Sequence, residues 1–276
     1  MGKTGIEWTD IVWNPVRGCS RISDGCRNCY AERFAARFAK EGQPWEGLVR
    51  WTGQGPQWTG DVNLIYDKLE EPMHWGKPRR VFVNSMSDLF HEKVPDNFLR
   101  DVFVVMGMTE RHTYQILTKR APRMEQWFGS QAAHEAADFL LENGIDWPLH
   151  NVWLGVSVES QDWASERLPG LLNCPAEVRF VSAEPLIDEL DLTLVEDPFE
   201  GGYFNALENG VDWVIVGCET GTRSQTRDMQ ESWVRDLRWQ CRSHDTAFFY
   251  KQAKDKNGRL VSLPLLDGER WNEYPR

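Results

Sequence analysis

The stretch Ile11-Val-Trp-Asn-Pro-Val-Arg-Gly-Cys19-Ser-Arg-Ile-Ser-Asp-Gly-Cys26-Arg-Asn-Cys29-Tyr30 joins a short apolar run to a loop with three cysteines. The run Ile11–Pro15 is short and β-branched at its start, which predicts a strand. After the loop, apolar residues recur at three- and four-residue intervals over Ala31–Lys40, which predicts a helix. The stretch therefore reads as a strand, a loop and a helix, the first unit of a parallel α/β fold.

The same unit recurs along the rest of the chain. Further strands are predicted at Val81–Ser85, Thr113–Leu117, Val152–Val158, Val178–Val181, Trp213–Val216 and Phe248–Tyr250. Further helices are predicted at Asp96–Met108, Ser130–Asn143, Gln161–Leu172 and Ser232–His244. Six or seven βα units in one chain predict an α/β fold built as a partial or full parallel (βα) barrel.

Two regions interrupt this alternation. Residues 41–76 are rich in Gly, Trp, Pro and Gln, and we interpret them as an insertion or a long connection after the first helix. The segment Glu196–Gly210 is predicted to be a loop, and either region could cover a site or be an ordinary surface excursion. The length of 276 residues suits a single barrel-like domain spanning 1–276.

Composition excludes several classes of protein. The hydrophobic fraction of 41% indicates a globular chain, and no apolar run is long enough to cross a bilayer. The first residues lack the apolar core of a secretory signal, so we expect a cytoplasmic protein without a membrane partner. A net charge of −11 argues against non-specific coating of nucleic acid. The basic groups Lys77-Pro-Arg79-Arg80 and Lys119-Arg120 are interpreted as solvated flanks of strands.

The six cysteines are better explained as thiols or metal ligands than as disulfides in such a compartment. Cys174, Cys218 and Cys241 are scattered and are predicted to be buried core thiols. Three thiolates from one loop are too few for a closed structural zinc site unless a histidine or carboxylate joins them. A 4Fe-4S cluster held by three cysteines keeps one iron open, and this iron can chelate S-adenosylmethionine and pass it the electron that breaks its carbon–sulfur bond.

The chemistry of a parallel barrel is found where its strands end at the carboxyl side. The exits of the predicted strands are polar at almost every position, and Ser and Glu recur among them. These exits are Gly18–Cys29, Asn84–Asp88, Thr118–Arg120, Ser157–Ser160, Ser182–Pro185, Gly217–Gly221 and Lys251–Gln252. We expect them to form one shared pocket.

Several short motifs together resemble the radical S-adenosylmethionine superfamily, and more closely an uncharacterised phage-associated family of radical-type proteins. The motifs are Ile6-Glu7-Trp8-Thr9, Trp13-Asn14-Pro15, Cys29-Tyr30-Ala31-Glu32, Asn84-Ser85-Met86-Ser87-Asp88-Leu89-Phe90, Leu117-Thr118-Lys119-Arg120 and Gly155-Val156-Ser157-Val158-Glu159. The resemblance covers nearly the whole chain. Residues 85–92 also resemble spore photoproduct lyase, which repairs a thymine lesion in DNA.

The resemblance implies roles for particular residues. Cys19, Cys26 and Cys29 would hold a 4Fe-4S cluster and be the catalytic metal ligands. The expected cofactor contacts are Tyr30, Asn84, Ser85, Ser87, Asp88, Ser157, Glu159 and Glu184. The expected substrate contacts are Lys119, Arg120, Glu219, Lys251 and Gln252. An electron donor such as flavodoxin or ferredoxin would be a partner.

The chain departs from the superfamily pattern in its cysteine loop and at the exit of its second strand, and Cys218 stands where its relatives carry glycine, which leaves a separate role for Cys218 open. Six residues, instead of the common three, separate Cys19 from Cys26, and the aromatic Tyr30 follows the third cysteine instead of preceding it. No Gly-Gly-Glu triplet follows the second strand, so Asn84, Ser85 and Asp88 would make the contacts to the methionine group. These departures put the packing of the aromatic over the adenosine in question.

Other residues admit two interpretations. Glu159 and Glu184 either touch a ligand or form ion pairs with Lys119 or Arg120. Glycines flank Glu219 and suit either a close ligand or a tight turn. His91 could donate a proton to a substrate or be a satisfied structural residue. The 14 tryptophans could stack on a base or fill the core.

The resulting hypothesis is a radical S-adenosylmethionine enzyme, of lyase or isomerase type, that abstracts hydrogen from a nucleobase in modified or damaged DNA. Hypermodification, isomerisation and repair all fit it. Two alternatives stay open at this point: a radical enzyme that acts on a peptide or small metabolite, and a non-catalytic binding protein stabilised by zinc or a cluster.

Overall fold

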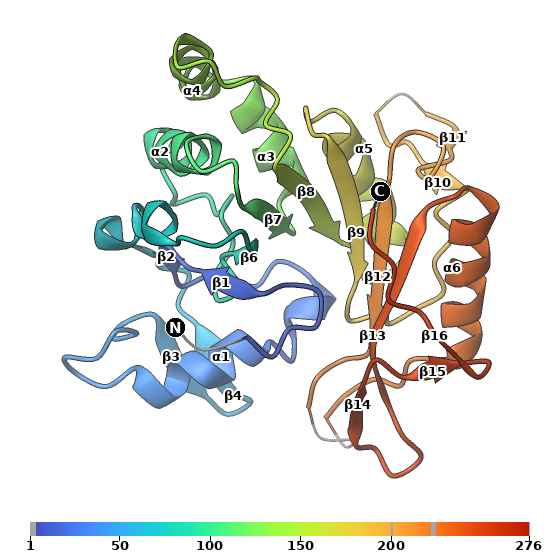
Figure 1. Cartoon of the computed structure of the whole chain (residues 1–276). Helices are drawn as coiled ribbons and strands as arrows, with labels where there is room; N and C mark the ends of the chain where they lie inside the picture. Colours follow the sequence, from blue (N-terminus) through green and yellow to red (C-terminus); the bar gives the residue numbers. More distant parts are fainter. Residues whose placement is uncertain (1–3, 200, 222–224, 276) are drawn as a thin grey trace.

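The computed structural model describes residues 4–199, 201–221 and 225–275. Its centre is an eight-stranded sheet in the order β1-β6-β7-β8-β9-β12-β13-β14 (Figure 1). The strands are β1 (Ile11–Trp13), β6 (Arg80–Val83), β7 (Thr113–Thr118), β8 (Val152–Ser157), β9 (Val178–Ala183), β12 (Trp213–Gly217), β13 (Ala247–Lys254) and β14 (Leu260–Ser262). All neighbours pair in parallel except β13 and β14, which are antiparallel.

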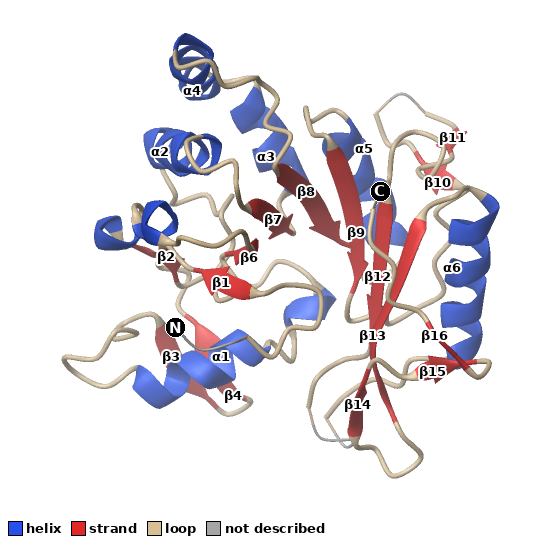
Figure 2. Cartoon of the chain, viewed as in Figure 1, coloured by secondary structure: helices blue, strands red, loops and turns tan. Residues whose placement is uncertain are grey.

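The sheet curls into a half-barrel, with β1 at one edge and β14 at the other (Figure 1). The helices cover its outer face, as Figure 2 shows. They are α2 (Asp96–Gly107), α3 (Ala121–Phe128), α4 (Gln131–Glu142), α5 (Gln161–Leu172) and α6 (Glu231–Ser243). The predicted α/β class is therefore confirmed, and the barrel is partial and open.

Side chains of the central strands alternate between two hydrophobic cores, as the two-residue period of a strand requires. Val81 and Val83 point to the large core beneath the outer helices, whereas Phe82 between them joins a second core. This second core is aromatic and also contains Trp8, Phe180 and Trp213. Because it belongs to the opposite face of the strands, it fills the concave side of the half-barrel.

Most predicted elements are found within a few residues of their expected bounds. The helix α5 matches its prediction, α2 differs by one residue at its end, and α4 and α6 differ by one residue at both ends. The prediction missed α3, which begins beside a proline at its first turn, a position that proline tolerates. It also missed β14, whose three residues Leu260–Ser262 are all exposed and too few to show an alternation of apolar and polar residues.

The predicted helix Ala31–Lys40 is shorter than expected. It consists of α1 (Tyr30–Ala35) followed by the 3-10 turn η2 (Ala36–Phe38). The predicted first strand also ends early, because Asn14 and Pro15 leave the sheet after β1. The cysteine loop contains one further short turn, η1 (Asp24–Cys26).

The insertion at 41–76 has structure of its own. It contains the hairpin of β3 (Val49–Thr52) and β4 (Gly55–Trp58), the strand β5 (Asn63–Leu64), and the 3-10 turns η3 (Tyr66–Lys68) and η4 (Glu71–His74). β5 pairs with β2 (Val16–Arg17), which returns the insertion to the sheet. The hairpin and α1 share a small core around Trp45, Leu48 and Trp58, and Cys19 and Cys29 pack against this core.

Four short strands, paired as two hairpins, lie in other connections of the described chain. The expected loop Glu196–Gly210 contains part of a hairpin of β10 (Val195–Glu196) and β11 (Tyr203–Phe204). Near the C-terminus, β15 (Leu265–Leu266) pairs with β16 (Glu269–Arg270). Within the described ranges, no helix has the length and apolar character needed to cross a membrane.

Candidate functional site

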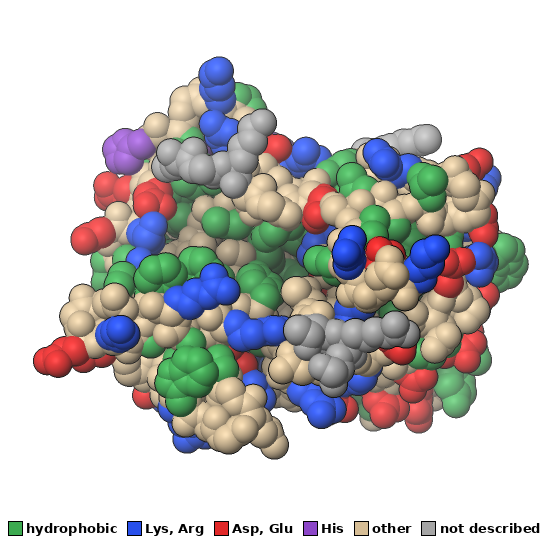
Figure 3. Space-filling model, turned by 90° about the horizontal axis from the view of Figure 1, so that it is seen from below, with side chains coloured by type: hydrophobic (Ala, Val, Ile, Leu, Met, Phe, Trp, Pro, Cys, Tyr) green, Lys and Arg blue, Asp and Glu red, His purple; other side chains and the backbone are tan. Residues whose placement is uncertain are grey.

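A cavity of about 230 Å³ lies where the parallel strands end, at the lower edge of the sheet in Figure 1. Seen from below, the molecule has a recess with hydrophobic side chains inside and Lys and Arg side chains around it (Figure 3). Fourteen of the predicted site residues line the cavity: Cys19, Cys26, Cys29, Tyr30, Asn84, Ser85, Ser87, Asp88, Lys119, Arg120, Ser157, Glu184, Glu219 and Lys251. Glu159 and Gln252 are not among the lining residues.

The three loop cysteines line one cavity and carry free thiols. Arg120 Nη1 donates to Cys19 Sγ at 3.9 Å, and Ser23 Oγ lies 3.7 Å from Cys26 Sγ. Burial is the main cause that raises the pKa values of Cys19 and Cys29. Among the residues that the structure describes, no three His, Cys, Asp or Glu side chains converge as they would on a single metal ion.

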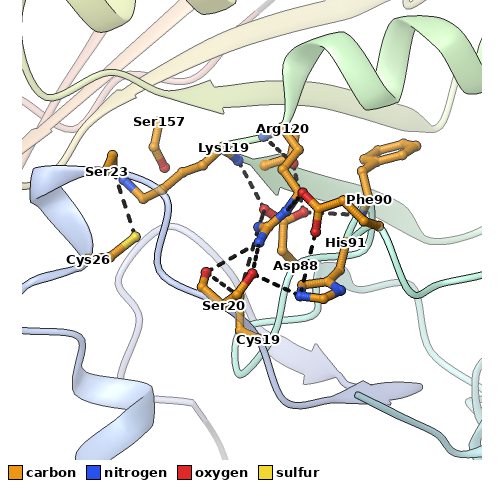
Figure 4. Close-up of polar contacts among 12 residues, drawn as sticks. Cys19, Ser20, Ser23, Cys26, Asp88, Phe90, His91, Lys119, Arg120 and Ser157 are labelled. Atoms are coloured by element: carbon orange, nitrogen blue, oxygen red, sulfur yellow. Dashed lines mark hydrogen bonds and ion pairs between the residues drawn. The ribbon is translucent and has the colours of Figure 1, made fainter. Parts of the chain in front are cut away.

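One end of the cysteine loop is held by a buried ion pair of Asp88 and Arg120 (Figure 4). Arg120 is only 5% exposed, and its Nη1 lies 2.9 Å from Asp88 Oδ2. The same guanidinium donates to the carbonyl and hydroxyl oxygens of Ser20 at 3.2 and 2.7 Å. The interpretation of Arg120 as a solvated flank is therefore wrong. Its charge is neutralised by Asp88 and Glu92, and its donors to Ser20 fix the loop next to Cys19.

The other end of the loop is held by Glu159, whose side chain is completely buried. Its Oε1 accepts from Ser23 Oγ at 2.7 Å and also contacts Lys119 Nζ. Its Oε2 lies 2.7 Å from Arg167 Nη1. Burial alone would raise the pKa of Glu159, but the nearby charges of Lys119 and Arg167 outweigh burial and lower it. Of the two predicted roles for Glu159, the ion pair is the one formed.

Gly25 is the residue that allows this contact. A Cβ atom at position 25 would overlap the carboxylate of Glu159. We expect Gly25→Ala to force the loop and Glu159 apart and to lower the free energy of unfolding by about 1–3 kcal/mol, as overpacking typically does. Urea denaturation measures this, with Gly5→Ala as a control because a Cβ at Gly5 would meet nothing within 4 Å. If the two variants have equal free energies of unfolding, the loop can move away from Glu159 without an energetic cost.

The later strand exits also carry paired charges. Lys251 Nζ lies 2.6 Å from Glu184 Oε1, and Arg227 forms an ion pair with Glu219. If Glu184 formed an ion pair, its expected partner was Lys119 or Arg120, and that expectation is wrong because Glu184 pairs with Lys251 of β13, two strands away from β9. The exit carboxylates Asp88, Glu159, Glu184 and Glu219 each have a cation beside them, so the wall of the cavity is close to electrically neutral.

Two buried donors at the cavity have no partner among the described residues. Trp8 and Asn84 are each 2% exposed and line the cavity, and neither Trp8 Nε1 nor Asn84 Nδ2 donates a hydrogen bond. Asn84 also has a φ of 59°, a left-handed conformation that asparagine tolerates better than most residues. Unsatisfied buried donors are costly, and beside a cavity they suit a ligand that carries acceptor atoms.

No role was predicted for Trp8, although it lies in the motif Ile6-Glu7-Trp8-Thr9. The apolar lining residues Phe82, Leu117 and Trp58 were not predicted either, whereas Met86 and Cys218 lie in predicted strand exits. The available signal for Phe82 was its place between Val81 and Val83, since alternation on a strand puts it on the face opposite to theirs. The position of Trp58 at the cavity could not be predicted from its neighbours in sequence, because the fold of the insertion brings it there.

The remaining predicted residues have plain structural roles or lie at the rim. His91 is buried, and its Nε2 lies 3.0 Å from Ser20 Oγ. Its pKa is lowered mainly by burial. This agrees with the interpretation of His91 as a structural residue with a hydrogen-bond partner. Gln252 donates to the Cys218 carbonyl at 2.9 Å. Tyr30 is about half exposed and donates to the Ser85 carbonyl at 2.5 Å.

The cysteines outside the loop and the tryptophans behave mostly as core residues. Cys174, Cys218 and Cys241 are all buried, as predicted. Burial raises the pKa of Cys218 to about 11, so this thiol is protonated at neutral pH. Most of the tryptophans are buried or half-buried, whereas Trp51 and Trp239 are exposed.

A comparison with protein families matches residues 3–275 to the family described as "Protein of unknown function (DUF5131)". No curated protein and no solved structure matches the chain. The family match extends over the sheet, the insertion and the cavity together.

Proposed function

We propose that this chain, which belongs to the family described as "Protein of unknown function (DUF5131)", is a radical S-adenosylmethionine enzyme. The observation that carries the proposal is the common position of Cys19, Cys26 and Cys29, which line one cavity at the carboxyl ends of a parallel, curled sheet. Chemistry in such folds is found at that edge.

The residues present fit a 4Fe-4S cluster by the chemistry of their donor atoms. Three thiols from one loop line the same cavity, and soft thiolates are the ligands that hold such clusters. When bound, a cluster with three cysteine ligands would supply an open iron for S-adenosylmethionine and the electron for its reductive cleavage.

The chain's own residues would hold this loop in a fixed geometry. Arg120 fastens Ser20, next to Cys19, and Glu159 fastens Ser23, between Cys19 and Cys26. The Arg120 contact to Cys19 Sγ would also place a positive charge beside a ligand sulfur. Hydrogen bonds and charges near ligand sulfurs are the means by which a protein adjusts the reduction potential of a cluster.

The cofactor and substrate would meet the neutral, largely apolar part of the cavity. The unpartnered N–H groups of Trp8 and Asn84 supply donors for the carboxylate or ring acceptors of a ligand. Ser85, Ser87, Asp88, Ser157 and Glu184 remain proposed cofactor contacts, as does Tyr30. Lys119, Glu219 and Lys251 are proposed to face the substrate, although each is already paired with another side chain.

We propose a nucleobase in modified or damaged DNA as the substrate, with hydrogen abstraction leading to hypermodification, isomerisation or repair. A flat, neutral base suits a cavity with an aromatic floor and few free charges. The proposal includes a cytoplasmic location, where a flavodoxin or ferredoxin can supply electrons.

The proposal is tested on protein purified without oxygen. We expect about four irons and four sulfides per chain, and formation of 5′-deoxyadenosine from S-adenosylmethionine after reduction with dithionite. One equivalent of zinc without any cleavage product would instead identify a structural zinc site. A labelled peptide, nucleoside and oligonucleotide are then compared as sources of deuterium for 5′-deoxyadenosine. If deuterium is transferred only from the peptide, the radical reaction is supported but the nucleobase is rejected as the substrate.

A further inference from the structure

An exposed row of aromatic side chains leads away from the cavity along α1 and η2. Tyr30, Phe34 and Phe38 are four residues apart, so they lie on the same face of this helical segment. They are 47%, 45% and 42% exposed, while Ala31 and Ala35 on the opposite face are buried in the small core of the insertion. The rings of Phe34 and Phe38 are 5.4 Å apart, and Tyr30 lines the cavity.

The charges beside this row are positive, although the chain as a whole carries −11. Residues 27–40 contain four basic side chains, Arg27, Arg33, Arg37 and Lys40. Their single acidic residue is Glu32, which is 1% exposed and neutralised by Arg21 at 2.5 Å. The segment therefore presents a net positive surface.

Most of these basic groups have no acidic partner. Among the described residues, Arg27, Arg37 and Lys40 are exposed and form no ion pair. Arg33 instead bridges the rim of the cavity, since its Nη2 donates to the carbonyl of Thr220 at 2.7 Å. Lys and Arg side chains stand beside hydrophobic ones around the recess in Figure 3.

We infer that α1 and η2 bind single-stranded nucleic acid and guide it into the cavity. Exposed aromatic rings in a row with unpaired basic groups beside them are the features that hold such a strand, because every base can stack on a ring and every phosphate attracts a cation. Bases would stack on Phe34 and Phe38, Arg37 and Lys40 would contact the backbone, and Tyr30 would mark the entrance. The inference rests on the proposed function for the reaction that follows in the cavity. The binding of the strand itself does not depend on that function.

The test is a binding titration by fluorescence anisotropy, with a fluorescein-labelled single-stranded oligothymidylate about 15 nucleotides long and the anaerobically purified full chain. We expect the double variant Phe34→Ala/Phe38→Ala to bind at least about tenfold more weakly, since loss of one stacked base typically costs that much. Arg37→Gln is expected to reduce the slope of log K against log salt by about 0.7, the value for one phosphate contact on a single strand.

Two control variants remove the same side-chain types elsewhere. Phe139 on α4 is 45% exposed, and Lys77 is exposed just before the amino end of β6. Phe139→Ala and Lys77→Gln are expected to leave both affinity and salt slope unchanged. Thermal unfolding followed by circular dichroism confirms that each variant is folded.

Three results would overturn the inference. The wild-type chain does not bind the oligonucleotide, the control variants lose as much affinity as the double variant, or the wild-type chain is a dimer and the double variant is a monomer. The last result, seen by sedimentation velocity, would assign the aromatic row to a second copy of the chain. Formation of 5′-deoxyadenosine without DNA is measured in parallel on the same samples. If the double variant still forms 5′-deoxyadenosine but no longer binds the oligonucleotide, both proposals are supported. If it still forms 5′-deoxyadenosine and still binds the oligonucleotide, only the proposed binding surface is rejected.

Discussion

Replacing Cys26 by alanine is expected to abolish iron binding and to lower the rate of 5′-deoxyadenosine formation by more than about 100-fold. Loss of an outer partner of a metal ligand already costs about 10–100-fold, and loss of the ligand itself costs more. Cys26 follows Ser23, which Glu159 fastens, and its Sγ lies 3.7 Å from Ser23 Oγ at the cavity, so no other cysteine of that loop can take its position. Cys19→Ala and Cys29→Ala are expected to have the same result.

Cys174→Ala is the matched control for these variants. Cys174 is also a free, buried cysteine, but its thiol donates to the Gly170 carbonyl at 3.1 Å at the end of α5, outside the cavity. We expect this variant to keep its iron, its sulfide and its absorbance near 400 nm, because the cluster loop is untouched. If Cys26→Ala also keeps them, the cluster proposal is wrong.

The arrangement of the sheet could be predicted from sequence because its signals are local. Alternation along Val81–Val83 and the helical spacing in α5 are each contained within a dozen residues. The gathering of polar strand exits at one cavity followed from parallel pairing alone, since all such exits face the same edge. That reasoning brought Cys19, Asn84 and Glu184 together correctly, although they are far apart in the chain.

The pair of Glu159 with Lys119 was one of two predicted interpretations, but the other ion pairs of the site could not be predicted, because they depend on which strands are neighbours and on how deep each side chain lies. Glu184 pairs with Lys251 across the sheet from β9 to β13, which are separated by β12. Arg120 looked like half of a solvated basic pair, yet the curl of the sheet buries it against Asp88. Sequence gives the charge of a residue, whereas burial decides whether that charge must be neutralised.

The ion pairs also change the meaning of the predicted site. Carboxylates at strand exits suggested ligand contacts, but Asp88, Glu159, Glu184 and Glu219 each hold a cation already. The groups left to bind a ligand are neutral donors and apolar walls. This favours recognition by shape, stacking and single hydrogen bonds over recognition of a charged substrate group.

Glu159→Gln is expected to lower the free energy of unfolding by about 3–5 kcal/mol, the usual cost of removing one partner from a buried ion pair. The substitution keeps the shape of the side chain but places an amide donor among the donors of Lys119 and Arg167. Arg167 is itself fully buried, so its charge would be left without compensation. Urea denaturation at pH 7 measures the loss, and Glu166→Gln, on an exposed position of α5, is the control, expected to stay within about 0.5 kcal/mol of the wild type.

The pH dependence distinguishes a lost charge from a lost shape. Because the pKa of Glu159 is lowered in the folded state, its contribution to stability is fully present above its unfolded pKa of about 4.5 and disappears as the pH falls through the lower folded value. The stability gap between wild type and Glu159→Gln should therefore be constant from pH 7 to about pH 5 and close at more acidic pH. A gap that stays open in acid would mean that Glu159 stabilises the cysteine loop by packing, and that the charges of Lys119 and Arg167 are balanced elsewhere.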